Sequence, residues 1–355
     1  MMKTRELHSD GTHYDWLDFL RFICAFIVVV GHARGFFFVD YSALNTESKG
    51  VITAAFYGLT RIGHEAVIAF FVLSGYFVGG RAAKRISEGN FNKSDYAIDR
   101  ISRVFLPLVP VVIFSALVSG FEDGFVVLLG NVLGLQGWIV PVLKANGPLW
   151  SLAYEIWFYF LVYIVANLFS RSPIGLGSLL MLVLAVWVFS CLKFQYLACW
   201  CIGALFYFKS IKVNGFVCAC VLFIGVLGLQ YTAPSMLSHG EDEGMHNLVR
   251  PLLEVILGSG VAMLCVILVH IKGNFLSQLS VKGASFSYTL YLTHYPVLFF
   301  LRDYGFEKSS VIDLSSCINY AVSVIICLVV SWGFYWFFER HTADLRQYLK
   351  NALSK

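Results

Sequence analysis

Long apolar runs recur along almost the whole chain and constrain its fold more than any other feature. The first extends from Trp16 to Phe38, and similar stretches follow as far as Phe338. An α-helix needs about 20 apolar residues to cross the hydrocarbon of a bilayer. Charged residues make up only 14% of the 355 residues, whereas about a quarter is usual for soluble domains. The sequence therefore predicts an all-α, polytopic membrane protein.

The apolar runs predict about ten transmembrane helices. We place them at about 16–36, 65–81, 104–121, 149–169, 175–192, 195–208, 214–231, 250–271, 285–301 and 313–338. The segment 124–143 is also apolar, but internal glycines and a proline interrupt it. Backbone that is not helical is tolerated at membrane depth only where protein covers it or water reaches it. We therefore expect a re-entrant or interfacial element there.

Basic residues predict which side of the membrane each loop faces, because cytoplasmic loops are enriched in lysine and arginine. With the N-terminus inside, the cytoplasmic segments carry Arg81, Lys84, Arg85, Lys93, Arg100, Arg103, Arg171, Lys209, Lys212, Lys272, Lys282 and the basic C-terminal tail. A membrane crossing at 124–143 would place four of these residues outside, namely Lys209, Lys212, Lys272 and Lys282. We therefore expect both termini in the cytoplasm, with tails at 1–14 and 340–355 and one membrane domain at 15–339.

The composition also argues against several kinds of site and partner. The nine cysteines lie almost all in apolar runs, as small helix residues do, and Cys199 and Cys201 lack the spacing of a zinc site. We expect no metal. The net charge of +4 is spread over membrane-flanking loops, so we expect the lipid bilayer as a partner and no nucleic acid. The first apolar run is too long for a signal peptide, so we expect it to stay in the membrane.

Ionisable side chains inside the apolar runs indicate a candidate site, because charge is costly in hydrocarbon. Arg21 and His32 share the first helix, about 16 Å apart along its axis and on roughly one face. Glu155 lies about 9 Å inside the fourth helix, at a depth that matches His32. Glu65 opens the second helix, where a carboxylate also complements the helix dipole without any catalytic role. A neutral histidine in a helix bundle is equally compatible with a hydrogen-bonded core position.

Arg100 and Arg103 stand at the opposite side of the membrane, three residues apart at the start of the third helix. They point the same way and suit either a phosphate group or lipid headgroups. In the ninth predicted helix, Pro296 frees a backbone carbonyl and His294 suits a structural hydrogen-bond donor. The small residues of the second helix favour close helix packing, and they are Ser74, Gly75 and Gly79.

In this order, these segments resemble the membrane-bound acyltransferase family 3, whose members are O-acyltransferases that modify bacterial glycans and related molecules. The matching segments are YDWLDFLRFICAFIVVVGHARG with Arg-x10-His, FFVLSGYFVGG with Ser-Gly-x3-Gly, DRISRVFLP with Arg-x2-Arg, LWSLAYEIWFY and SYTLYLTHYP. The likeness extends from about Asp15 to about Glu339. Two features depart from it: Ile68 and Ala69 replace an acid common in the second helix, and no proline follows Phe338 and Glu339.

The resemblance implies an O-acyltransferase of the bacterial inner membrane, expected to be an O-acetyltransferase. It implies acyl-CoA, expected to be acetyl-CoA, as a cytoplasmic co-substrate, a hydroxyl of a cell-surface or lipid-linked glycan as acceptor, and no permanently bound cofactor. His32 would act as a base or as a transient acyl acceptor, with Glu155 orienting it and Glu65 substituting for the family acid. Residues near the acyl-CoA phosphates would be Arg21, Arg100 and Arg103. Structural or substrate-path roles would belong to Ser74, Gly75, Gly79, Trp150, Ser151, Tyr288 and His294.

Two other classes of membrane protein share some of these features. A transporter of acyl groups or lipid-linked sugars also needs buried ionisable residues, but the duplicated halves and paired broken helices typical of transporters are not evident in the sequence. A receptor or structural membrane protein would make the aligned histidine and glutamate incidental. Only the acyltransferase interpretation predicts group transfer.

Overall fold

The computed structural model of the protein describes residues 14–169, 175–209, 211–232, 243–271, 275–305 and 308–353. Of residues 243–247 and 275–282 it describes the backbone and not the side chains. The helices are α1 Asp15–Phe37, α2 Val51–Thr60, α3 Gly63–Ser74, α4 Arg81–Ser87, α5 Lys93–Val118, α6 Gly124–Val132, α7 Trp150–Leu168, α8 Leu176–Cys191, α9 Phe194–Lys209, α10 Gly215–Tyr231, α11 Glu243–Val269, α12 Phe275–Asp303, α13 Leu314–Phe337 and α14 Thr342–Leu353. These described residues contain two isolated β-bridges and no strand. The predicted all-α class is confirmed.

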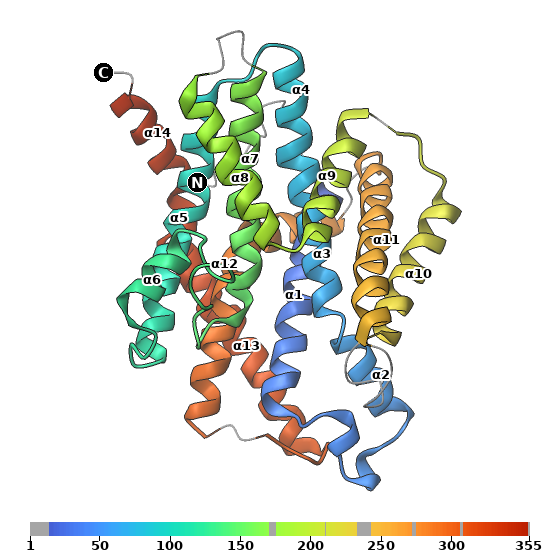
Figure 1. Ribbon diagram of the computed structural model, residues 1–355. Helices are drawn as coiled ribbons and strands as arrows, with labels where there is room; N and C mark the ends of the chain where they lie inside the picture. Colours follow the sequence, from blue (N-terminus) through green and yellow to red (C-terminus); the bar gives the residue numbers. More distant parts are fainter. Residues whose placement is uncertain are drawn as a thin grey trace.

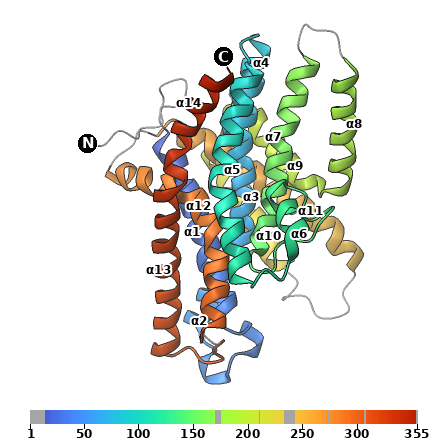
Figure 2. The same cartoon turned by 90° about the vertical axis from the view of Figure 1, so that its left-hand side faces the viewer.

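The helices form a bundle with two distinct ends (Figures 1 and 2). One end, here called the terminal end, carries α4, α14, the start of α1 and the start of α5. Lys350 of α14 pairs with Asp95 of α5 at 2.6 Å, and Arg346 pairs with Asp99 at 3.0 Å. The opposite end, here called the α2 end, carries α2 and the loop between α12 and α13. Both described ends of the chain therefore lie at the same end of the bundle.

The predicted number of crossings is confirmed only in part. Each of the ten predicted intervals contains helix, and six helical stretches are long and apolar enough to cross a membrane, or seven if a bent helix pair counts as one span. The predicted spans outside those six fall on α8, α9, α10 and α12. Helices α8 and α9 have 16 residues each, about 24 Å of rise against roughly 30 Å of hydrocarbon.

Helices α8 and α9 are bent by 118° with respect to one another. In Figure 1, α8 descends from the terminal end and α9 returns toward it. At the turn between them, the backbone N–H of Lys193 donates to the hydroxyl of Tyr154 on α7 at 3.2 Å. Helices α8 and α9 together therefore start and finish at the terminal end. The chain leaves the pair on the same side of the bundle on which it entered.

The interrupted segment 124–143 does not form a crossing helix. Helix α6 has only nine residues, about 14 Å of rise, and the chain then folds back along α5 and α7. Buried amides hold this loop: Asn131 Nδ2 donates to the carbonyl of Pro141 at 3.0 Å, and Gln136 Nε2 donates to that of Leu149 at 2.8 Å. The structure agrees with the expected short element that does not span the membrane.

Glycines allow α3, and the π-helical segment Gly75–Gly80 that follows it, to touch α9 at backbone distance. A Cβ at Gly75 would lie 1.9 Å from the carbonyl oxygen of Trp200, and one at Gly79 would lie 2.6 Å from its ring. On α9, a Cβ at Gly203 would lie 2.2 Å from the carbonyl oxygen of Val72. At Gly75, Gly79 and Gly203 the contact with the facing backbone or ring therefore leaves no room for a larger residue.

Several sequence predictions fall on residues outside this description. They concern the N-terminal tail at 1–13, the loop residues Arg171 and Lys272, and the side chain of Lys282. The predicted C-terminal tail, by contrast, is mainly helical, because α14 occupies Thr342–Leu353 and packs against α5.

Candidate active site

Two histidines from opposite ends of the sequence meet between α1 and α12. Nδ1 of His32 lies 2.9 Å from Nε2 of His294, and the two rings stack with centroids 5.1 Å apart and planes 11° apart. Tyr295 packs edge-on against His32 at 5.3 Å. His294 is fully buried. Sequence analysis selected both histidines, one as catalytic and one as structural, but did not pair them.

The backbone of α12 fixes which nitrogen of each histidine carries the proton. Nδ1 of His294 lies 3.1 Å from the carbonyl oxygen of Leu290, and only a protonated nitrogen can donate to a carbonyl. In neutral His294 the Nε2 atom is therefore an acceptor, so His32 must donate from Nδ1. This assignment leaves Nε2 of His32 with a free lone pair, and Nε2 forms no hydrogen bond within the described part of the chain.

Pro296 leaves one backbone carbonyl of α12 without a hydrogen bond inside the helix. The loop before α7 binds this carbonyl. A proline at position 296 cannot donate to the carbonyl of Leu292 four residues earlier. Nδ2 of Asn146 donates to that carbonyl at 2.9 Å and contacts the hydroxyl of Ser115 at 3.1 Å. Asn146 is fully buried. It anchors the short helical turn Gly147–Leu149 beside α12 and so fixes the start of α7.

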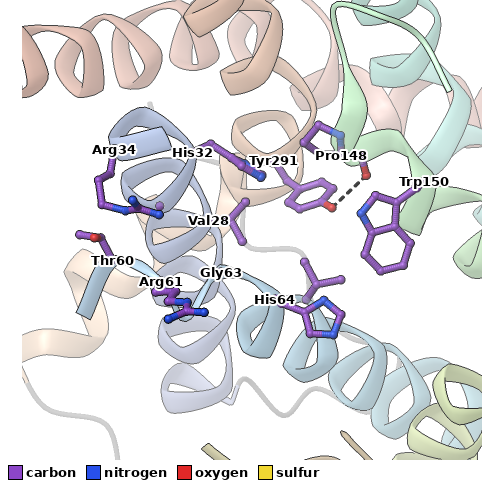
Figure 3. A pocket seen from close by; sticks show the side chains of 12 residues that line it. Val28, His32, Arg34, Thr60, Arg61, Gly63, His64, Pro148, Trp150 and Tyr291 are labelled. Carbon is purple, nitrogen blue, oxygen red and sulfur yellow. Dashed lines mark hydrogen bonds between the residues drawn. The ribbon is translucent and has the colours of Figure 1, made fainter. Parts of the chain in front are cut away.

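A cavity of 230 Å³ opens beside His32. It is lined by Val28, Gly31, His32, Arg34, Thr60, Arg61, Gly63, His64, Val67, Pro148, Trp150 and Tyr291. In Figure 3, Arg34, Thr60 and Arg61 form one side, and Trp150, Pro148 and Tyr291 form the other. His32 lies between the two sides. The tight contact that brings α2 to α1 depends on Gly31, where a Cβ would lie 2.7 Å from the carbonyl oxygen of Thr60.

A second histidine of the cavity is paired with a buried acid. Nε2 of His64 lies 2.7 Å from Oε1 of Glu254 on α11, and Nε of Arg250 lies 3.6 Å from the same oxygen. Glu254 is only 2% exposed. The His64 ring is stacked on Trp150 with centroids 6.3 Å apart. Neither His64 nor Glu254 was predicted, although the acid in the apolar stretch RPLLEVILG carries the signal of a buried ionisable group.

The similarity of the whole sequence to known families agrees with this geometry. The family model described as the acyltransferase domain of family 3 matches residues 14–336. The chain belongs to acyltransferase family 3. No curated protein and no solved structure gives a significant match. The match covers every residue that lines the cavity and both histidines of the pair.

In this family 3 acyltransferase, Glu155 does not orient His32 as expected. Its carboxylate accepts a hydrogen bond from the hydroxyl of Tyr159, which contacts Ser74 at 3.4 Å. Nε1 of Trp200 on α9 donates to the same Ser74 hydroxyl at 3.3 Å. Because Nδ1 of His32 is already bound by His294, the orienting position that Glu155 was expected to fill is taken. Glu155 belongs instead to a network that joins α3, α7 and α9.

Glu65 also lies apart from the histidine pair. It is buried, and its Oε1 accepts a hydrogen bond from Nε2 of Gln230 on α10 at 2.6 Å. Its neighbour His64 lines the cavity, whereas Glu65 does not. A rotation of about 100° between successive helical residues separates these two side chains. The structure therefore gives no support to Glu65 as a substitute for the family acid.

The predicted donor-binding arginines of this acyltransferase lie near the terminal end. Arg21 pairs with Asp18 at 3.5 Å, and its guanidinium carbon is 5.7 Å from the ring centroid of Phe77. Arg100 pairs with Asp99 and lies 5.2 Å from the ring centroid of Tyr159. Arg103 lies in the same helix, α5, three residues after Arg100, and it also has a partner. The cavity beside His32 includes none of these arginines.

The remaining predicted residues of the acyltransferase motifs support the helices around the cavity. The hydroxyl of Ser151 lies 2.7 Å from that of Tyr291, which also donates to the carbonyl of Pro148 at 3.0 Å. The hydroxyl of Tyr288 contacts the carbonyl of Val104 at 3.4 Å. Trp150 lines the cavity itself. Over the described ranges, no group of three or more His, Cys, Asp or Glu side chains is placed to hold a metal ion.

Proposed function

We propose that this protein is an integral membrane O-acyltransferase that moves an acyl group from acyl-CoA to a hydroxyl of a glycan. The observation that carries the proposal is the lone pair on Nε2 of His32, which the chain of hydrogen bonds from Leu290 through His294 leaves free beside a cavity. A neutral imidazole held in one tautomer is suited to general-base catalysis. Membership of the acyltransferase family supplies the reaction class.

In the proposed reaction, an acceptor hydroxyl enters the cavity and donates its proton to Nε2 of His32 while its oxygen attacks the thioester carbonyl carbon. The new C–O ester bond forms, and the C–S bond breaks. The proton on Nε2 then passes to the departing thiolate, so His32 is neutral again and free CoA carries the thiol proton. The Nδ1–H of His32 stays hydrogen-bonded to Nε2 of His294 throughout. This hydrogen bond stabilises the imidazolium that exists after Nε2 has taken the proton and before it gives the proton to the thiolate.

Nε2 of His32 is equally placed to accept the acyl group itself in a two-step reaction. In that sequence Nε2 would attack the thioester carbonyl, the C–S bond would break and CoA would leave as its thiolate. The acceptor hydroxyl would then attack the acyl-imidazole, breaking the C–N bond, and its proton would pass to water, which balances the thiolate. The two routes differ in one measurable respect. When acyl-CoA with a labelled acyl group is supplied without an acceptor, only the two-step route leaves the label on the protein.

We propose that acyl-CoA, with acetyl-CoA as the expected donor, approaches from the terminal end and that this end faces the cytoplasm. Two arginines there have buried Nε atoms without an acceptor among the described residues, namely Arg81 and Arg100. Buried donors of this kind suit the phosphates of CoA. Basic residues near the membrane ends favour the cytoplasmic side. With this orientation, in a bacterial inner membrane, the α2 end and the acceptor glycan would face outward.

The decisive experiment compares wild type with His32→Ala in membrane vesicles supplied with labelled acetyl-CoA and a mixed glycan extract. We expect His32→Ala to lose at least about 10²-fold in transfer to glycan, the usual contribution of a general base. The matched control is His270→Ala, an exposed histidine at the end of α11, which should keep wild-type activity. Full glycan acylation by His32→Ala at equal expression would overturn the assignment of His32 as the base.

A further inference from the structure

Two arginines of the cavity have no evident task in acyl transfer. Arg34 is in the last turn of α1, two residues beyond His32, and Arg61 stands at the break between α2 and α3. Both line the cavity, on the side away from Trp150 (Figure 3). Both lie toward the α2 end, opposite the arginines of the terminal end.

The positive charge of these two arginines is not balanced by ion pairs. None of the ion pairs found among the described residues includes Arg34 or Arg61. Of the nearby acids, Glu254 is engaged by His64 and Arg250, and Glu65 accepts a hydrogen bond from Gln230. The exposed Asp40 acts on Arg61 as a charge but forms no ion pair with it among the described residues. The guanidinium carbon of Arg34 lies 4.8 Å from the ring centroid of Tyr57.

One donor of Arg34 is buried and unsatisfied. Its Nε has no hydrogen-bond acceptor among the described residues. A buried donor without an acceptor costs free energy, and two cations in one small cavity repel each other. An oxyanion in the cavity would offset the repulsion between the two cations, because a guanidinium offers donors in a fixed fork that matches a carboxylate or phosphate group.

The opposite side of the cavity suits a sugar ring. Trp150 is stacked on His64 at 6.3 Å, and it packs against Tyr196 at 5.3 Å. Aromatic walls with a few polar groups are typical of small-molecule sites. The volume of 230 Å³ is below the roughly 300–1,000 Å³ of pockets for drug-sized ligands, so the cavity fits one sugar unit and not an oligosaccharide.

We propose that the acceptor of this acyltransferase is anionic, and that Arg34 and Arg61 bind its carboxylate or phosphate group while the sugar ring lies against Trp150. The inference rests on the proposed function of His32. Because His32 lies between the arginines and Trp150, the acylated hydroxyl belongs to the same sugar unit that carries the charge, or to the unit directly joined to a phosphate.

The test uses purified protein in lipid nanodiscs with labelled acetyl-CoA and three acceptors of equal size. Methyl glucoside is neutral, methyl glucuronoside carries a carboxylate, and glucose 1-phosphate carries a phosphate. We expect transfer to at least one charged acceptor to exceed transfer to the neutral one about tenfold or more. Whichever charged acceptor is preferred identifies the anion. Equal use of all three, or preference for methyl glucoside, would overturn the inference and leave the acyltransferase proposal standing.

Variants assign the preference to the two arginines. Arg34→Gln and Arg61→Gln should each raise KM for the charged acceptor by about tenfold to a hundredfold, as expected for the loss of a charge-assisted hydrogen bond. KM for methyl glucoside and for acetyl-CoA should not change. The matched control is Arg302→Gln, a surface arginine paired with Asp303 at 2.8 Å. An increased KM for acetyl-CoA alone would assign the arginines to the donor and overturn the inference.

A binding measurement separates this inference from the reaction itself. Thermal unfolding of wild type in nanodiscs should shift upward with methyl glucuronoside or glucose 1-phosphate, and less so with methyl glucoside. Arg34→Lys and Arg61→Lys keep the charge, so they serve where the glutamine variants fold poorly, and they should retain part of the shift. If no acceptor is acylated but the charged ligands still bind, the proposed function fails and the anion site stands.

Discussion

At the residue scale, the hydrogen bond from His32 to His294 fixes which nitrogen of His32 carries the proton. His294 does not line the cavity, and its Nδ1–H is committed to the carbonyl of Leu290. It accepts the Nδ1–H of His32 and so keeps the lone pair on Nε2 of an imidazole that lines the cavity. In the proposed reaction, His294 would therefore be a positioning residue, like the orienting group of a catalytic triad.

This role predicts an order of activities among variants of His294. His294→Ala removes the acceptor, so His32 can rotate or change tautomer, and kcat should fall about 10²-fold. In His294→Gln the side-chain oxygen replaces Nε2 as an acceptor, so kcat should recover in part. His294→Asn is shorter and should resemble alanine. The measurement is kcat and KM for acetyl-CoA in vesicles, with KM unchanged throughout.

A merely structural His294 would give a different result. In that case His294→Ala would reduce the amount of folded protein without changing kcat per folded molecule, and glutamine and asparagine would be equivalent. His270→Gln, at an exposed position, controls for the substitution itself. Equal kcat for the alanine and glutamine variants would contradict the positioning role.

How far the sequence predicts the site depends on how local the relevant contacts are. His32 was found because a histidine inside an apolar run is unusual. Its partner His294 is 262 residues away, and nothing in the local pattern indicates that the two meet. Glu155 was matched to His32 by depth alone, but depth does not give the rotation of one helix about its axis. Glu65 was chosen as a carboxylate at the start of the second helix, whereas its neighbour His64, which lines the cavity, was not considered.

At the element scale, the contact between Asn146 and α12 joins a loop to a proline-containing helix. Asn146→Ala leaves the carbonyl of Leu292 without a donor in a buried environment, which should lower the free energy of unfolding by about 1–3 kcal/mol. In Pro296→Ala the new amide N–H can donate to that same carbonyl. Asn146→Ala should therefore cost about 1 kcal/mol less in the Pro296→Ala background.

The measurement is a double-mutant cycle on unfolding in detergent, with Asn45→Ala, at an exposed loop position, as the control for an asparagine substitution. Additive effects of the two substitutions would show that the carbonyl freed by Pro296 is not what Asn146 satisfies. A favourable coupling supports the link. That link also explains why the Gly147–Leu149 turn, and with it Trp150, lies beside the histidine pair.

The apolar runs were sufficient to predict where helices occur, because burying backbone in lipid requires helix. They were not sufficient to decide which helices cross. Helix α10 has 17 residues and α8 and α9 have 16 each, so their lengths are close to the minimum for a span. The expected interruption of 124–143 agrees with the nine-residue α6, because glycine and proline mark places where a helix ends.

At the scale of the whole molecule, the proposed reaction needs two ends with different accessibility. The donor would reach Arg81 and Arg100 from the terminal end, and the acceptor would reach Arg34 and Arg61 from the α2 end. The histidine pair lies between them, where α1 and α12 pack side by side (Figures 1 and 2). An acyl group would then pass between the two sides without any movement of the glycan across the membrane.

The two-ended arrangement predicts a pattern of cysteine labelling in sealed vesicles. Lys84→Cys and Gln347→Cys mark the terminal end, and Lys49→Cys and Lys144→Cys mark the α2 end, all at exposed positions. An impermeant maleimide should label the first pair only in inverted vesicles and the second pair only in right-side-out vesicles. Lys193→Cys, in the α8–α9 turn, should react slowly in both because that turn lies at the depth of Tyr154.

The native cysteines require a control, because Cys191, Cys201 and Cys317 are exposed. Each variant is therefore made in a background with these three replaced by serine, and that background alone should give little label. The residue that decides most is Lys144. If 124–143 crossed the membrane, Lys144→Cys would be labelled from the same side as Lys84→Cys, and every later helix would be inverted. Helix α14 would then be expected on the side opposite the start of α5, against the pairing of Lys350 with Asp95.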